Sequence, residues 1–243
     1  MFKRRIDIDR VSSRDVKKGR EIVGYFEYEL DQLQLDQDAG QRIIERAGEL
    51  KTGIRNLLKN LSASNQFATE WETFYQTNFG LKLDLLRVKI PEKCSGFNRL
   101  LIIVPGVLNQ AYDVCAKHFL CWKYVDDLDA TVPTNDRTTA NGAYAIWVRD
   151  GQEADNQWMS HSADDLTEIG IKGETLLERL IHELKYFSET GKHLDVNNIT
   201  LCSGSRNTDG HVPCVLWSGV KLRVCCYSSS RAYGHLGCRE VVS

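Results

Sequence analysis

The stretch that decides the fold of the C-terminal region is Val212-Pro213-Cys214-Val215-Leu216-Trp217-Ser218-Gly219-Val220-Lys221-Leu222-Arg223-Val224-Cys225-Cys226-Tyr227. It predicts a β-hairpin, because two runs rich in β-branched and aromatic residues flank the two-residue connection Ser218-Gly219. Asp209-Gly210 marks the turn before it. The predicted register pairs Trp217 with Val220, Val215 with Leu222, and Pro213 with Val224.

Side chains alternate across a strand, so this register divides the hairpin into two faces. The first is apolar and is expected to belong to the core: Pro213, Val215, Trp217, Val220, Leu222 and Val224. The second is expected to be an open display surface: Cys214, Leu216, Lys221, Arg223, Cys225 and Tyr227. A slip of one residue would expose the apolar set, which predicts a firm register.

A polar, aperiodic loop, Ser228–Gly237, follows the hairpin and leads to the apolar strand Cys238–Val242. Loops held on a rigid scaffold concentrate binding residues. The mixture of Tyr, Ser and Gly is also that of adaptable binding surfaces. An ordinary solvated loop has the same composition, so composition alone leaves both interpretations open.

The C-terminal region also contains a set of residues, here called the frame residues, whose spacing forms a recognisable pattern. They are Leu201-Cys202-Ser203-Gly204-Ser205-Arg206, Asp209-Gly210, Val212-Pro213, Trp217, Leu222, Val224, Ala232, Leu236 and Arg239-Glu240-Val241-Val242-Ser243, with Tyr144–Asp150 and Leu176–His193 upstream. This pattern resembles the variable-region end of target proteins of diversity-generating retroelements, over roughly residues 97–243. The chain departs from the family pattern at Cys226, where Trp is usual, and at Ser229, where the family has a Pro-containing turn.

The resemblance implies an α+β, C-type-lectin-like domain that displays a hypervariable patch, diversified by copying errors at adenines. The implied ligand-binding positions lie within about residues 202–243: Asn207, His211, Cys214, Leu216, Ser218, Arg223, Cys225, Ser228, Ser230, Arg231, Tyr233, Gly234, His235 and Gly237. Most are reachable from Asn or Tyr codons. The implied function is non-enzymatic binding of a protein or surface ligand through protein–protein interaction, without a cofactor.

Residues 1–90 are expected to form a basic arm and a helical region for assembly or attachment. Residues 1–20 hold eight Lys/Arg against three Asp, a net +5, which leaves −7 for the remainder of a chain of net charge −2. An arm of this kind fits an alternative function, an intracellular regulatory protein that contacts nucleic acid. A solvated terminus explains the same residues more simply.

From Asp36 to about Asn78 the apolar residues have helical spacing. A heptad seam with 4-3-4-3-4 spacing is formed by Ile43, Ala47, Leu50, Ile54, Leu57 and Leu61, and Phe67, Trp71 and Phe74 continue the stripe. Such a helix packs on its own domain or pairs with a second copy. A homo-oligomer through residues 43–61 would multiply the binding sites.

Residues 91–243 are expected to form the ligand-binding domain. The predicted elements are a buried strand at Arg99–Val104, an amphipathic helix at Leu108–Trp122, a strand at Ala143–Val148, a short helix capped by Ser162 and Asp165, a long helix at Leu176–Phe187 ended by Gly191, and a strand at Asn198–Cys202. This order is α+β. It is compatible with a lectin-like fold in which the first and last strands pair.

Groups that suggest catalysis or metal binding are few. Cys115, His118 and Cys121 share only a broad helix face and lack an evident fourth ligand. His182-Glu183 resembles the opening of a zincin motif, but Tyr186 occupies the place of the second histidine. We therefore expect no catalytic residues and no metal site.

The chain contains eight cysteines. No apolar run of the signal-peptide kind follows Met1-Phe2-Lys3-Arg4-Arg5, and no segment is long and apolar enough to span a membrane. Free thiols and a cytoplasmic location are the expectation, with display at a surface left open.

Calcium dependence tests the lectin interpretation directly. Neither Pro133 nor Pro213 lies in the Glu-Pro-Asn or Gln-Pro-Asp motif of sugar-binding lectins, and Trp217 is not followed by Asn-Asp. Thermal melts with calcium and with chelator should therefore coincide. A large stabilisation by calcium would instead show that the acidic run of Asp126, Asp127 and Asp129, which we interpret as a polar loop, binds the cation.

Overall fold

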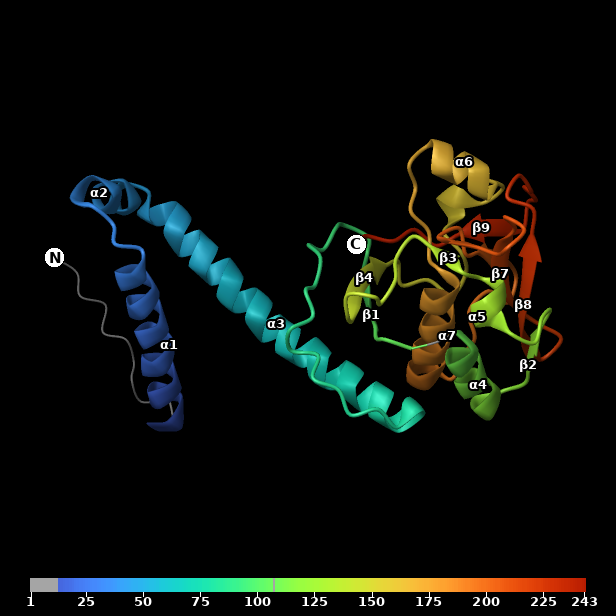
Figure 1. The fold of residues 1–243 in the computed structure, drawn as a ribbon, viewed down its shortest axis with the longest axis horizontal. Coiled ribbons are helices and arrows are strands. Elements are labelled where there is room, and N and C mark those ends of the chain that lie inside the picture. The colour runs from blue at the N-terminus through green and yellow to red at the C-terminus, as the bar shows by residue number, and fades with distance from the viewer. Residues whose placement is uncertain (1–12, 107) are drawn as a thin grey trace. The chain divides into compact units, whose positions relative to one another are not determined.

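The computed structural model describes residues 13–106 and 108–243 (Figure 1). The chain divides into two compact units, residues 1–61 and 62–243. The sequence analysis expects a boundary near residue 90, about thirty residues later than this division. Trp71, Phe74, Tyr75 and Leu85 are buried in the core of the second unit, so the chain enters that unit well before Pro91.

The first unit contains α1 (Ser13–Gln32), α2 (Gln37–Glu45) and the beginning of α3 (Ala47–Phe79). Residues 13–20 of the expected arm belong to α1, and residues 1–12 lie outside the described residues. The helix expected from Asp36 is interrupted at Arg46, whose backbone N–H bonds to the carbonyls of Arg42 and Ile44 and ends α2. Asp36 caps the start of α2 by accepting a hydrogen bond from Ala39 N at 2.6 Å.

The second unit is built on a five-stranded mixed sheet. In spatial order its strands are β2 (Cys121–Lys123), β8 (Lys221–Tyr227), β7 (Val212–Ser218), β5 (Ile199–Leu201) and β9 (Leu236–Cys238). The β2–β8 and β5–β9 pairs are parallel, and the other two are antiparallel. Two smaller sheets pair β1 (Arg99–Ile103) with β4 (Tyr144–Val148), and β3 (Thr134–Asn135) with β6 (Ser205–Arg206).

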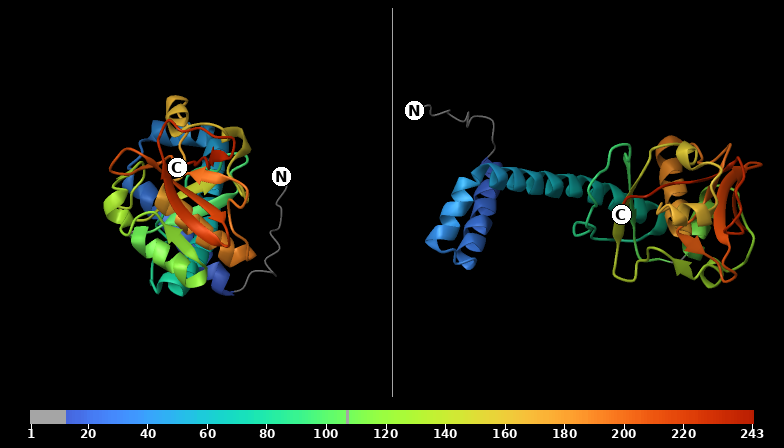
Figure 2. Two further views of the ribbon diagram at one scale, coloured as in Figure 1. Left: turned by 90° about the vertical axis from the view of Figure 1, so that its right-hand side faces the viewer. Right: turned by 90° about the horizontal axis from the view of Figure 1, so that it is seen from above.

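Helices complete the second unit and make the predicted α+β class correct. They are α4 (Leu108–His118), α5 (Leu128–Thr131), a 3₁₀ turn (Asn156–Trp158), α6 (Ala163–Glu168) and α7 (Leu176–Thr190). The capping box of Ser162 and Asp165 is confirmed, and Gly191 ends α7 in the left-handed conformation at φ 67°. Helix α7 lies beside the five-stranded sheet in both orientations (Figures 1 and 2). Within the described residues no helix has the length and apolarity needed to cross a membrane.

The hairpin of β7 and β8 forms, but its register differs from the predicted one. The observed pairs are Trp217 with Leu222 and Val215 with Val224, so the two-residue connection is Gly219-Val220. Both connecting residues have positive φ, 59° and 64°, as a type I′ turn requires. The shift displaces the strands by two residues and therefore leaves every side chain except that of Val220 on its predicted face. Val220 is 72% exposed at the turn.

The first face of the hairpin packs into the main hydrophobic core as predicted. This core joins β1, β4, α4 and α7 to Val215, Leu222 and Val224, and Trp217 packs against it. The second face is only partly accessible, which corrects the sequence interpretation of an open surface. Near β5 and β9 it forms a smaller core: Ala163, Ile199, Leu201, Val212, Cys214 and Leu236, with Leu216, Cys225 and Tyr227 partly buried against it.

Two other predictions for this unit are wrong. The helix at Leu108 ends at His118, and Trp122 lies on β2, because the chain joins the sheet where Leu222 N donates to Leu120 O at 2.9 Å. The first strand does not pair with the last one. Strand β1 pairs with β4, and Val242 reaches the same sheet through two 2.9 Å backbone bonds with Trp147.

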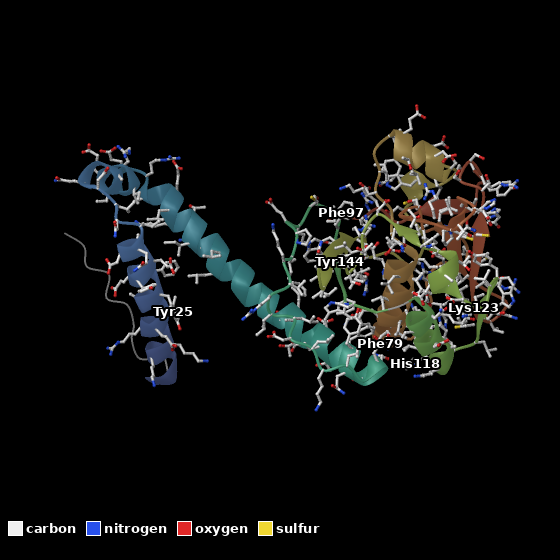
Figure 3. The ribbon with its side chains drawn as sticks, in the orientation of Figure 1. Tyr25, Phe79, Phe97, His118, Lys123 and Tyr144 are labelled. Carbon is white, nitrogen blue, oxygen red and sulfur yellow. The ribbon has the colours of Figure 1, made fainter. Side chains whose placement is uncertain are left out.

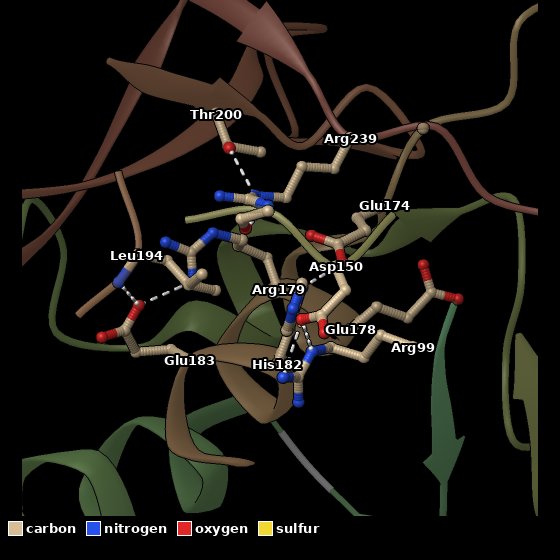
Figure 4. A network of polar contacts seen from close by, with 12 residues as sticks. Arg99, Asp150, Glu174, Glu178, Arg179, His182, Glu183, Leu194, Thr200 and Arg239 are labelled. Carbon is tan, nitrogen blue, oxygen red and sulfur yellow. Dashed lines mark hydrogen bonds and ion pairs between the residues drawn. The ribbon is translucent and has the colours of Figure 1, made fainter. Parts of the chain in front are cut away.

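A buried ionic cluster joins distant parts of this unit (Figure 4). Asp195 accepts hydrogen bonds from Arg179 at 2.7 Å, Arg239 at 2.6 Å and Thr200 at 2.7 Å. Asp195 and Arg179 have no exposed surface, and Arg239 is 1% exposed. Burial favours the protonated acid, but the charges of Arg239 and Arg179 outweigh burial and hold the pKa of Asp195 below its ordinary value. The cluster thereby ties α7 and β5 to the C-terminal segment.

A second buried pair, Glu174 and His182, lies beside this cluster (Figure 4). Glu174 Oε1 and His182 Nδ1 are 2.8 Å apart, and neither side chain is exposed. Burial raises the pKa of Glu174 to about 8. Burial, and then the charges of Arg239 and Arg179, hold the pKa of His182 well below its ordinary value. Both groups are therefore neutral at pH 7.

Removing the central carboxylate should cost most of the stability of the second unit. Asp195→Asn leaves the buried Arg239 guanidinium without a counter-ion and Arg179 with Glu183 alone, and breaking a buried pair in this way costs about 3–5 kcal/mol. The control is Asp150→Asn, since Asp150 is half-exposed in its pair with Arg99 and exposed pairs contribute about 0–1 kcal/mol. Urea unfolding followed by tryptophan fluorescence measures both. Equal effects of the two substitutions would show that the buried cluster contributes no more than the surface pair.

The buried acid predicts a pH dependence. The folded protein keeps the Glu174 proton up to about pH 8, whereas the unfolded chain releases it near its ordinary pKa of 4.5, so Glu174 makes stability fall as pH rises. His182 opposes this only below about pH 6.5. From about pH 6.5 to 8 the free energy of unfolding should therefore fall by at most ~1.4 kcal/mol per pH unit. The melting temperature, measured across this range, should fall with it. The Glu174→Gln side chain is neutral at every pH, so this variant should lose the pH dependence. An unchanged pH dependence would show that another group causes it.

Candidate ligand-binding site

The fourteen implied binding positions differ in accessibility. Six are exposed: Ser218, Ser230, Arg231, Tyr233, Gly234 and His235. Five are half-buried: His211, Leu216, Arg223, Cys225 and Ser228. Three are buried: Asn207, Cys214 and Gly237. Eleven of the fourteen can therefore contact a ligand from the surface.

The three buried positions have structural roles, so expecting them to face outward is wrong. The side-chain oxygen of Asn207 accepts from Asp209 N at 3.0 Å and His211 N at 2.8 Å, which fixes the turn before β7. Cys214 belongs to the smaller core. Gly237 lies so close to neighbouring side chains that a Cβ there would clash with Met159 Sδ and lie 2.9 Å from Ala154 Cβ. Substitution at these positions would disturb packing before it changed a surface.

The loop of residues 228–235 carries a compact group of aromatic and cationic side chains, here called the Arg-Tyr-His cluster: Arg231, Tyr233 and His235. Tyr233 and His235 are stacked, with ring centroids 5.6 Å apart and planes at 15°. The Arg231 guanidinium carbon lies 5.1 Å from the Tyr233 ring centroid, and its Nη1 donates to the Tyr233 hydroxyl at 2.5 Å. Tyr227 meets Tyr233 edge-on at 6.3 Å. These contacts hold the rings in place before any ligand binds.

Backbone bonds hold the loop that carries the cluster. Near its start, Asp164 N donates to Ser229 O at 3.1 Å, and Ser229 Oγ donates to Asp164 Oδ2 at 3.1 Å. Near its end, Ile199 N donates to His235 O at 2.8 Å. Leu236, which has no exposed surface, follows directly in β9. The loop is therefore fixed at both ends to α6 and to the sheet.

The hairpin contributes a second part of the surface. The Arg223 guanidinium lies 5.8 Å from the Trp122 ring, and Arg223 faces Leu216 across the two strands. Cys225 faces Cys214. The hydrogen bond between these thiols, assisted by the charge of Arg223, lowers the pKa of Cys225, and the same bond together with burial raises the pKa of Cys214.

The structure does not bring all the accessible positions together. Ser218 pairs with Lys221 at one end of β8, whereas Tyr227 ends the strand beside the Arg-Tyr-His cluster. At about 3.3 Å per residue these ends are roughly 20 Å apart. A small ligand would reach one end only, and a macromolecular ligand would be needed to cover both.

Two further residues lie at the edge of the candidate site, although the resemblance does not assign them to it. Tyr227 contacts Tyr233, and strand alternation placed it on the same face as Cys225, so the sequence contained a signal for it. Trp122 lies under Arg223, and its spacing with Phe119 and Cys115 indicated a helix instead. Only the parallel pairing of β2 with β8 brings Trp122 to the site.

The weaker chemical candidates are explained by structural contacts. Asp129 accepts from Leu108 N at 2.7 Å and Asn109 N at 3.1 Å at the start of α4, and Asp127 caps α5. Cys115 is fully buried, and its sulfur lies 3.8 Å from Leu180 O. In the described part of the chain, no three His, Cys, Asp or Glu side chains are grouped so that they could hold a metal ion.

The ends of α4 and β2 carry His118 and Lys123 (Figure 3). Lys123 Nζ donates to Asp126 O at 2.6 Å and lies 4.8 Å from the Tyr112 ring, so this cation is bound within the protein. His118 is exposed in the last turn of α4 and does not join the buried Cys115.

One hollow of about 590 Å³ in the second unit is bordered by Arg137, Tyr144 and Ser243. Its most polar groups are already engaged: Arg137 Nε and the Tyr144 hydroxyl donate to Glu178 at 2.7 and 2.8 Å. None of the fourteen positions lines it. The hollow is therefore separate from the candidate site.

Comparison with known proteins found no match: no protein-family model, no curated protein and no solved structure matches the chain.

Proposed function

We propose that this chain is a non-enzymatic ligand-binding protein of the diversity-generating retroelement type, whose variable patch binds a protein or another surface component. One observation carries the proposal: most frame residues between 201 and 243 are buried, whereas most of the implied binding positions are accessible. Among the frame, Val212, Leu222, Val224, Leu236 and Arg239 are buried. Eleven of the fourteen implied positions reach the surface between them. A patch that varies without unfolding its scaffold needs this separation.

Several features of the second unit support a C-type-lectin-like scaffold. Two helices, α4 and α7, pack with a mixed sheet whose longest strands form the β7–β8 hairpin. The C-terminal segment returns to the sheet of β1 and β4 through Val242. The accessible positions lie on the hairpin and on the loop after it, as the resemblance implies.

The chemistry of the patch suits a macromolecular ligand. Tyr233 offers a large amphipathic ring that needs little ordering, and stacking on His235 restricts it further. Arg231 keeps donors for carbonyl or carboxylate acceptors. Ser228 and Ser230, whose hydroxyls are 3.1 Å apart, add short adaptable groups.

Thermal melts of substituted chains test the separation of frame from patch. The combined substitution Arg231→Ala, Tyr233→Ala and His235→Ala changes exposed side chains, so stability should change by about 0.5 kcal/mol or less per site. Leu222→Ala should cost about 2–5 kcal/mol, because it opens a cavity in the main core. Asn207→Ala should cost about 1–3 kcal/mol, since two part-buried backbone donors lose their acceptor. If the triple substitution costs as much as Leu222→Ala, the cluster is structural and the proposal is wrong.

The neighbouring DNA gives an independent test of diversification. We expect a reverse transcriptase gene and a near-copy of the 3′ coding end that differs at adenines. These differences should fall in codons of the eleven accessible positions and avoid those of Cys214 and Gly237. Differences spread evenly over frame and patch would contradict the proposal.

A further inference from the structure

Helix α1 presents an apolar face that the first unit leaves uncovered. Val23, Phe26, Leu30 and Leu33 follow 3-4-3 spacing, a heptad seam that runs to the end of α1 and one residue beyond, here called the α1 seam. Val23, Leu30 and Leu33 are 54%, 52% and 63% exposed. Ile22 lies beside the seam and is also exposed. An apolar stripe of this length is typical of an association surface.

The charges of α1 are ordered along its axis. In the N-terminal half Lys17, Lys18 and Arg20 outnumber Glu21, and the C-terminal half carries Glu27, Glu29 and Asp31. This order opposes the helix dipole, which favours acidic residues near the start and basic residues near the end. The pattern therefore does not stabilise an isolated α1. A second helix running in the opposite direction would place each basic half beside an acidic half.

We propose that two copies of this chain pair through their α1 seams, antiparallel and related by a two-fold axis. In this register Val23 of one copy packs on Phe26 of the other, and Gly19 packs opposite Leu30, each contact occurring twice. Gly19 has open space where a side chain would be, so Leu30 meets no obstacle. Beside the seam, Arg20 faces Glu27, and the two-fold axis repeats this ion pair.

The charge pattern selects α1 of a second copy over the seam of α3. The α3 seam is also uncovered, with Leu50 and Leu57 about half-exposed. Its basic neighbours Lys51 and Arg55 would complement only the acidic half of α1 and would leave the basic half beside like charge. A reversed α1 complements both halves at once, which is the self-complementarity that a two-fold interface requires.

Pairing through α1 would join two ligand-binding units without using their patches. Two linked sites bind a repetitive surface more tightly than one site, because the second contact forms at high effective concentration. The inference rests on α1 alone, so it stands or falls independently of the ligand that the patch binds.

Sedimentation equilibrium of the full chain tests the pairing. The native protein should be a dimer, and Leu30→Asp should be monomeric. The single reversals Arg20→Glu and Glu27→Arg should each weaken dimerisation about tenfold, because each replaces two attractions by two repulsions. The combined substitution Arg20→Glu/Glu27→Arg restores opposite charges and should return the dissociation constant to within about threefold of the native value.

The control is Leu57→Asp on α3, which should leave the dimer intact. All five tryptophans lie in residues 62–243, so near-ultraviolet circular dichroism checks that each variant keeps its second unit folded. A monomeric native chain overturns the proposal. Dissociation by Leu57→Asp with a stable Leu30→Asp dimer also overturns it and assigns the contact to α3. Failure of the double reversal to restore the dimer rules out the antiparallel register.

Discussion

The second unit depends on one carboxylate enclosed by two guanidinium groups. Asp195 lies between α7 and β5, and it receives Arg179 from the helix and Arg239 from the last segment of the chain. None of these charges reaches water, so each depends on the buried partners around it, which for Arg179 also include Glu183. Arg239 also donates to the carbonyls of Gly151 and Gln152, which brings the segment after β4 into the same cluster. Helix, sheet and C-terminus are thus held in one mutual arrangement.

This arrangement supports the candidate binding surface indirectly. Backbone bonds from Asp195 N to Gln152 O and from Trp217 N to Asp195 O connect the cluster to the hairpin. On its first face the hairpin rests on the main core, and on its second face a smaller core supports it. The Arg-Tyr-His cluster follows from the end of this doubly supported hairpin. Its rigidity is therefore a property of the scaffold as much as of its own stacked rings.

Local patterns predicted local structure well, and long-range contacts account for the errors. Capping residues and helical spacing located α6 and α7, and alternation located β7 and β8. The register was missed because a β-branched residue, Val220, occupies a left-handed position that such residues rarely adopt. Helix α1 was missed because its lysines and arginines were interpreted as a solvated arm. The ionic cluster joins residues 179, 195 and 239, and no local pattern marks partners that far apart.

The candidate site was predictable in outline. Gaps between frame residues located the loop and the hairpin, and eleven of the fourteen positions are accessible. The exceptions arise from tertiary packing. Alternation alone gives Cys214 and Cys225 the same face, but β5 and Leu236 cover the first far more completely than the second. Gly237 looks like any loop glycine until the approach of Met159 and Ala154 is known.

The backbone hydrogen bonds that hold the loop of residues 228–235 have an evolutionary consequence. Asp164, Ile199 and Arg231 donate their backbone N–H groups to carbonyl oxygens of Ser229, His235 and Ser228. Every amino acid carries a backbone carbonyl oxygen, so exchanging the side chain at an acceptor position leaves these hydrogen bonds intact. The path of the loop is encoded largely by atoms that mutation does not remove. Many different sequences can then share one backbone trace, and selection can explore new recognition surfaces without first rediscovering a fold.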